Sequence, residues 1–160
     1  MKIFIAGAKS IMCLDDYVVS KLHSIREKGY DVIVGDCTGV DSLVQEFFKS
    51  VHYPNVTVYA SQGKARNNLG LWPVHAVPVP DGVKGFAFYR QKDIAMAQDA
   101  DCGFMIWDGN SKGTKANIQT MTRLGKKVIV HFPSTDNSFT VLNEDDIAST
   151  ELSSLQVSML

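Results

Sequence analysis

A short polar stretch between an apolar segment and a helix carries the residues best suited to chemistry. Residues 102–107 form an apolar run, and residues 108–114 read Asp-Gly-Asn-Ser-Lys-Gly-Thr. The pattern that follows predicts a helix from Thr114 to Leu124. The N–H groups at the start of a helix lack backbone partners and carry partial positive charge, so they bind anions such as phosphate. The stretch is therefore the centre of a predicted nucleotide-type site.

Side chains around this helix start strengthen that interpretation. Ser111 and Thr114 offer hydroxyl groups, and Gly113 lets a ligand approach the backbone. Asn117 lies on the same helix face as Thr114, and its amide can point back at the loop. Asp108 opens the loop. The alternative is an ordinary turn followed by capping of the helix by serine and threonine.

Three other small or polar loops follow predicted strands at residues 2–6, 31–35 and 55–60. Ligands of open α/β sheets bind outside the carboxyl ends of the strands, so we expect these loops to meet the first one. The predicted ligand-binding residues are Gly7, Lys9, Ser10, Gly35, Asp36, Gly39, Asp41, Arg66, Asn67, Asn68, Trp72, Tyr89, Trp107, Asp108, Ser111, Gly113, Thr114 and Asn117.

Individual roles follow from side-chain chemistry. Asp41 could accept hydrogen bonds from ribose hydroxyls, or it could simply suit the start of its helix. Arg66 could clamp phosphate or be a solvated surface charge. Trp72 or Trp107 could stack on a base. The spacing of Tyr89, Lys92 and Asp93 permits a ligand-facing patch without favouring one.

The chain alternates apolar strands with periodic segments that predict helices at residues 15–29, 40–51 and 86–100. This alternation predicts an α/β fold, a Rossmann-like three-layer sandwich with a mainly parallel sheet of about five strands. Residues 1–133 form the predicted domain. Residues 134–160 are a predicted C-terminal extension, with a short edge strand near 139–142 and a docked helix or tail after it. Residues 61–85 are a predicted long loop.

Composition narrows the class of function. The net charge of -1 gives no basic surface for nucleic acid, and no apolar run is long enough to span a membrane. Three cysteines form no metal-ligand spacing and suggest a reducing, cytoplasmic setting. The four histidines share no ligand spacing either, so we predict no metal and no cofactor. P-loop and dinucleotide-binding glycine patterns are absent from the sequence.

Five short motifs, in this order and spacing, resemble the SLOG superfamily, which includes the cytokinin-activating LOG proteins and the DNA-processing protein DprA. They are Ile3-x-Ile-Ala-Gly7, Gly35-Asp36-x-x-Gly39-Val-Asp41, Arg66-Asn67-Asn68, Tyr89-x-x-Lys92-Asp93, and the stretch from Trp107 to Asn117. The chain looks most like the small YspA-like branch. The resemblance spans residues 3–131 and implies a nucleotide-related ligand and a homodimer or higher oligomer.

The same resemblance raises one question of mechanism. In LOG-type phosphoribohydrolases a glutamate follows the Gly-Thr pair at this helix start, whereas the nearest position here is Asn117. An amide cannot act as a nucleophile or general base. We therefore expect a nucleotide-binding sensor or sequestering module. The alternative is a hydrolase or transferase of the N-glycosidic bond in nucleoside 5′-monophosphates, with Asp41 or Asp108 as the catalytic carboxylate.

Overall fold

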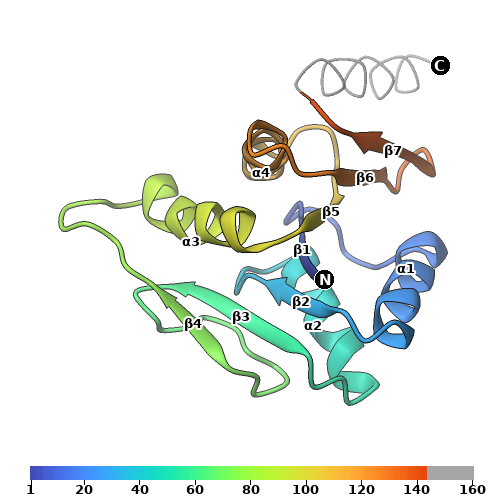
Figure 1. Ribbon diagram of the computed structural model, residues 1–160, viewed down its shortest axis with the longest axis horizontal. Helices are drawn as coiled ribbons and strands as arrows, with labels where there is room; N and C mark the ends of the chain where they lie inside the picture. The colour runs from blue at the N-terminus through green and yellow to red at the C-terminus, as the bar shows by residue number, and fades with distance from the viewer. Residues whose placement is uncertain (144–160) are drawn as a thin grey trace.

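The computed structural model describes residues 1–143, in which seven strands form one sheet (Figure 1). The strand order is β4-β3-β2-β1-β5-β6-β7, and all neighbours are parallel except β6 and β7. The strands are β1 (Lys2–Gly7), β2 (Asp31–Val34), β3 (Val56–Ser61), β4 (Val74–Val77), β5 (Cys102–Ile106), β6 (Val128–Phe132) and β7 (Asn137–Val141).

Four helices within residues 1–143 cover the two faces of this sheet. They are α1 (Asp16–Glu27), α2 (Val40–Ser50), α3 (Phe86–Asp99) and α4 (Lys112–Arg123). Figure 1 shows α1 and α3 on opposite sides of the sheet. The apolar residues of α1 and α2 belong to one core, and those of α3 and α4 belong to the other. The predicted α/β fold with a mainly parallel, three-layer arrangement is therefore confirmed.

Strand β1 shows why the sequence gives a sheet buried on both sides. Ile3 and Ile5 pack into the core under α1 and α2, whereas Phe4 and Ala6 pack into the core under α3 and α4. Successive side chains of a strand point to opposite faces, so a strand covered on both faces must be apolar throughout. This is the continuous apolar pattern from which a parallel sheet was predicted.

The strand order reverses between β1 and β5. The chain leaves β1 toward α1 on one face and leaves β5 toward α4 on the other. Gly7 allows the two strand ends to meet, because a β-carbon there would lie 2.3 Å from the carbonyl oxygen of Ile106. The N–H of Ala8 donates to the same oxygen at 3.0 Å. A crevice for a ligand opens at such a reversal.

The prediction of about five strands was too low. Strand β4 lies inside the segment that was predicted to be one long loop, where it pairs with β3 at the sheet edge. It has four residues between two prolines, and only Val77 is buried. A strand this short and exposed produces no apolar run, so its sequence resembles a loop.

The other end of the sheet agrees better with expectation. The predicted edge strand near residues 139–142 is β7, which runs from Asn137 to Val141 and pairs antiparallel with β6. The helix or tail predicted for residues 144–160 lies outside the described residues. Among residues 1–143, no helix is long and apolar enough to cross a membrane.

Candidate functional site

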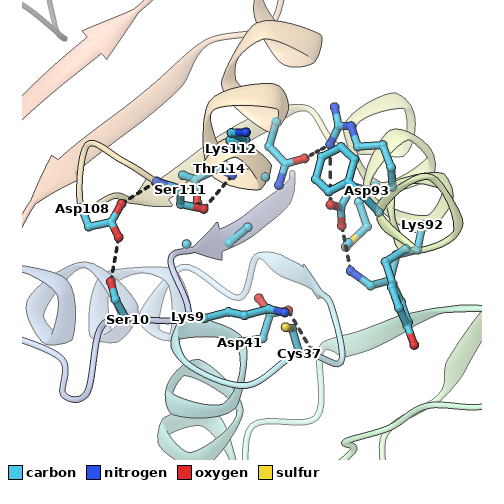
Figure 2. A pocket seen from close by; sticks show the side chains of 18 of the residues that line it. Lys9, Ser10, Cys37, Asp41, Lys92, Asp93, Asp108, Ser111, Lys112 and Thr114 are labelled. Carbon is cyan, nitrogen blue, oxygen red and sulfur yellow. Dashed lines mark hydrogen bonds and ion pairs between the residues drawn. The ribbon is translucent and has the colours of Figure 1, made fainter.

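A cavity of about 720 Å³ lies at the strand reversal, between the loops that follow β1, β2 and β5 and one face of α3. We call it the switch-point cavity. Figure 2 shows labelled side chains converging on it from those loops and from α3. Its lining comprises Ala6, Gly7, Lys9, Ser10, Cys37, Asp41, Arg66, Gly85, Phe86, Tyr89, Arg90, Lys92, Asp93, Met96, Asp108, Asn110, Ser111, Lys112, Gly113, Thr114 and Asn117.

The start of α4 forms one wall of this cavity. Ser111 is the N-cap residue, and its hydroxyl oxygen accepts from the N–H of Thr114 at 3.3 Å. The helix has no backbone partner to offer the N–H groups of Lys112 and Gly113, its first two residues. A β-carbon on Gly113 would meet nothing within 4 Å among the described residues, so the backbone is open at this point. The side chain of Lys112 is exposed at the same wall.

Asp108 organises the loop before α4. One carboxylate oxygen accepts from the N–H groups of Asn110 and Ser111, both at 2.8 Å, and the other accepts from the hydroxyl of Ser10 at 2.7 Å. Burial would raise the pKa of Asp108, but these hydrogen bonds outweigh burial and hold it below its ordinary value. The carboxylate joins the loops after β1 and β5, and its bonds leave it poorly suited to accept a proton.

A group of buried charges forms the floor of the cavity. Asp41 and Lys92 are 6% and 4% exposed, and Lys92 Nζ donates to Asp93 Oδ1 at 2.8 Å. Gly35 makes room for them, because a β-carbon there would lie 2.7 Å from Asp41 Oδ2 and 3.0 Å from Lys92 Nζ. Burial would lower the pKa of Lys92, but Asp93 and Asp41 outweigh it and raise the pKa above its ordinary value. Lys92 is therefore positively charged beneath the cavity.

Asp41 is the carboxyl group with the largest change in acidity near the cavity. Burial disfavours its ionised form and raises its pKa to about 6, even though Lys92 acts in the opposite direction. The N–H of Cys37 donates to Asp41 Oδ2 at 3.1 Å. A carboxyl group with this pKa can accept a proton at neutral pH, and Asp41 also lines the cavity.

Asn117 contacts α3 instead of the loop before α4. Its amide oxygen accepts from Arg90 Nη1, and Arg90 Nη2 donates to the carbonyl oxygen of Ala116 at 2.9 Å. Arg90 also forms an ion pair with Asp93 at 3.6 Å. The asparagine thereby fixes an arginine in the cavity wall, a partner that sequence spacing alone does not reveal.

Arg66 joins the wall of the cavity to the loop after β2. Its guanidinium donates to both carboxylate oxygens of Asp36, at 2.9 and 3.3 Å. The backbone N–H of Arg66 donates to the same carboxylate at 2.9 Å. Burial would raise the pKa of Asp36, but Arg66 outweighs it and lowers the pKa. The guanidinium also lies 4.0 Å from the ring centre of Tyr89. Arg66 is thus held in the cavity wall by a buried carboxylate and an aromatic face.

Several predicted residues lie outside the switch-point cavity. Asn67 donates to Ser42, and the side chain of Asn68 bonds to both the N–H and the carbonyl of Trp72. The indole of Trp72 donates to Tyr53 and lines a separate hollow of about 1030 Å³ beside residues 48–54. These residues anchor the loop before β4, so Trp72 is not placed to stack on a ligand in the cavity.

Trp107, Gly39, Gly35 and Asp36 also lie behind the lining. Trp107 is only 1% exposed and packs on Phe132, so it cannot offer a free face to a base. Gly39 has φ +77°, and a β-carbon there would lie 2.5 Å from Lys9 Cα. It therefore lets the loop after β1 approach the start of α2.

The predicted ligand-binding residues include 11 of the 21 residues that line the cavity, and they leave out part of α3 and α4. The additional polar residues are Cys37, Arg90, Lys92, Asp93, Asn110 and Lys112, and Phe86 is an additional aromatic one. Phe86, Tyr89, Asp93 and Met96 recur at helical spacing and share the cavity-facing side of α3. That periodicity was visible in the sequence, although spacing alone cannot distinguish a ligand-facing side from a surface.

One cluster of possible metal ligands lies elsewhere. Ligand atoms of Asp15, His131 and Asp136 are within 4.8 Å of one another, an arrangement that sequence spacing did not predict. The buried imidazole of His131 is already engaged, with Nε2 at 2.6 Å from Asp15 Oδ2 and Nδ1 at 2.7 Å from Ser138 Oγ. Asp15 also caps α1 through the N–H of Val18. These bonds account for the cluster as a structural link between α1, β6 and β7.

Comparison with known proteins adds no functional assignment. No protein-family model matches the chain, and no curated protein matches it in sequence. We therefore infer the function from the geometry of the site.

Proposed function

We propose that this chain binds a nucleotide or a nucleotide-derived ligand in the switch-point cavity and acts as a sensor or sequestering module. The observation that carries the proposal is the open start of α4, with its unpaired N–H groups at Lys112 and Gly113, facing a cavity at the strand reversal. A nucleoside monophosphate or an ADP-ribose-type molecule is the ligand class that we propose.

The charge and size of the cavity support a phosphate-bearing ligand. Lys112 supplies a cationic side chain at the start of α4, Lys9 supplies one from the loop after β1, and Lys92 supplies another at the floor. The volume of about 720 Å³ falls within the range of about 300–1,000 Å³ that is typical of small-molecule sites. Proposed contacts are phosphate at Gly113 and Lys112, and hydroxyl groups of a sugar at Asp41.

We also propose the wider setting that the sequence suggested. The chain is a SLOG-like protein of the cytoplasm and forms a homodimer or higher oligomer. These proposals rest on the motifs from Ile3 to Asn117 and on the cysteine content. The net charge of -1 favours a small molecule over nucleic acid as the partner.

A thermal-shift panel tests the binding proposal. AMP, GMP, CMP, UMP and ADP-ribose are added to the wild-type protein, and at 100 times its dissociation constant a true ligand should raise the Tm by about 5–10 °C. Gly113→Trp should remove that shift, because an indole would fill the space before the α4 N–H groups. Lys127→Ala, a change at an exposed lysine just before β6, should leave the shift unchanged. A Tm that ignores the whole panel would contradict the proposal.

The raised pKa of Asp41 supports a second candidate function, cleavage or transfer of the N-glycosidic bond of a nucleoside 5′-monophosphate. In hydrolysis, Asp41 would take a proton from water as the water oxygen bonds to the anomeric carbon. The bond from that carbon to the base breaks, the base leaves with the electron pair, and it takes up the proton that Asp41 holds. Asp108 was the other predicted catalytic carboxylate, but its hydrogen bonds to Ser10, Asn110 and Ser111 make it the weaker candidate.

Release of free base from the same monophosphates, followed by chromatography, tests the enzymatic candidate. Asp41→Asn should lower the rate by about 100-fold or more, since an amide cannot accept the proton. Asp108→Asn should lower the rate less than Asp41→Asn does, because Asp108 holds the loop before α4 and does not take the proton. If the wild-type protein releases no base, the enzymatic candidate fails for these substrates while the binding proposal stands on its own panel.

A further inference from the structure

The outer part of α3 presents an aromatic surface to the switch-point cavity. Phe86 is the first residue of the helix, and its exposed fraction is 62%. Tyr89 follows by three residues and is 40% exposed. Both side chains line the cavity, and Gly85 lines it just before them.

The two rings are not equivalent. The Arg66 guanidinium covers a face of Tyr89 at 4.0 Å, and Phe88 meets Tyr89 edge-on. Phe86 has no ring contact or cation–π contact among residues 1–143. Water therefore reaches most of an apolar ring at the cavity mouth, which is unfavourable unless something else covers it.

Along α3, the residues that face the cavity become charged and then fully buried. Beyond Tyr89, the cavity-facing side carries Arg90 and Asp93, and then Met96, which is only 1% exposed. The charged floor around Lys92 and Asp41 suits the hydroxyl groups of a sugar, whereas the mouth at Phe86 suits an apolar planar group. A ligand with both kinds of group would fit if its planar part remained at the mouth.

We infer that Phe86 is the stacking surface for the base of the ligand and determines its affinity for molecules that carry a planar aromatic ring. This inference rests on the proposed nucleotide-binding function and assigns the base-binding role to α3 instead of Trp72 or Trp107. Tyr89, held by Arg66, forms the adjoining wall. The ligand class is thereby narrowed to phosphorylated sugars that bear a heteroaromatic base, and bare sugar phosphates become poorer ligands.

Calorimetric titration with AMP and ribose 5-phosphate tests the inference. Phe86→Ala should weaken AMP binding by about tenfold or more, because stacking on an aromatic side chain typically contributes that much. The affinity for ribose 5-phosphate should not change, since that probe has no base. Leu71→Ala, a 90% exposed apolar residue outside the cavity, is the matched control and should affect neither probe.

A second variant gives an independent signal. Phe86→Trp retains a stacking ring, so it should bind AMP, and the fluorescence of its exposed indole should change with AMP but not with ribose 5-phosphate. The native residues Trp72 and Trp107 are 8% and 1% exposed, so they should contribute little to that change.

The possible results distinguish the stacking role of Phe86 from the proposed binding of a nucleotide. Equal loss of both probes in Phe86→Ala, or no loss of either, overturns the stacking role while nucleotide binding stands. Failure of the wild-type protein to bind either probe or any nucleotide of the panel overturns the proposed function and this inference with it. Circular dichroism of each variant checks its fold, which we expect to be retained because Phe86 is exposed.

Discussion

Replacing Arg66 with methionine is expected to lower the free energy of unfolding by about 2–3 kcal/mol. The change leaves the Asp36 carboxylate, which is 4% exposed, without its charged partner. Removing one partner of a fully buried pair costs about 3–5 kcal/mol, and the 38% exposure of the Arg66 side chain reduces that cost. Chemical denaturation at pH 7 measures the loss.

The pH dependence of this loss identifies its cause. Arg66 lowers the pKa of Asp36, so the pair contributes stability above the ordinary pKa of aspartate, and that stability is lost as the pH falls through the lowered pKa. The difference between Arg66→Met and the wild-type protein should therefore shrink toward acidic pH. Lys64→Met, an exposed lysine in the same loop, should stay within about 0.5 kcal/mol of wild type. An Arg66→Met protein as stable as wild type at pH 7 would show that the ion pair is not required.

Asp41→Asn is expected to change the pH dependence of stability in the opposite direction. Burial raises the pKa of Asp41 from 3.8 to about 6, so the folded protein holds this proton more tightly than the unfolded chain does. The contribution of Asp41 to stability is fully present below about pH 4 and is lost as the pH rises through 6. Relative to Asp41→Asn, the wild-type protein should lose up to about 3 kcal/mol between pH 4 and pH 7.

This second prediction is measured by denaturant titration of both proteins at several pH values. The asparagine keeps an oxygen that can accept from the N–H of Cys37, so the comparison isolates the charge. Asp81→Asn, in the exposed loop before α3, is the control. Its free energy of unfolding should depend on pH in the same way as that of the wild-type protein. A constant difference between Asp41→Asn and wild type across this range would contradict the raised pKa.

The sequence predicted the fold well where strands are buried on both faces. β1 and β5 are almost entirely apolar, which is the pattern of a strand that is buried on both faces. Both strands do pack against helices on the two faces of the sheet. Strand β4 was missed because pairing at the sheet edge, and not an apolar pattern, defines it. The cap of α1 by Asp15 was predictable, since aspartate before an apolar periodic segment is a local signal.

The candidate site was predicted less completely, for a physical reason. Glycines and hydroxyls at strand ends are local signals, so Gly113 and Ser111 were found. Residues that are far apart in the sequence and contact each other only in the folded protein were not found. Nothing in the sequence relates Arg90 to Asn117 across two helices, and nothing distinguishes the buried Trp107 from a tryptophan with a free face. The sequence does not distinguish Phe86 from any other apolar helical residue, because its exposure at the cavity depends on the fold.

The central claim is that the start of α4 holds the phosphate of a nucleotide, and one matched titration tests it most directly. Whichever monophosphate of the panel stabilises the protein most is compared by calorimetry with its nucleoside, which lacks only the phosphate. We predict that the nucleotide binds at least about tenfold more tightly and that Gly113→Trp abolishes this advantage. Equal affinity for nucleotide and nucleoside, or no binding of either, would contradict the claim.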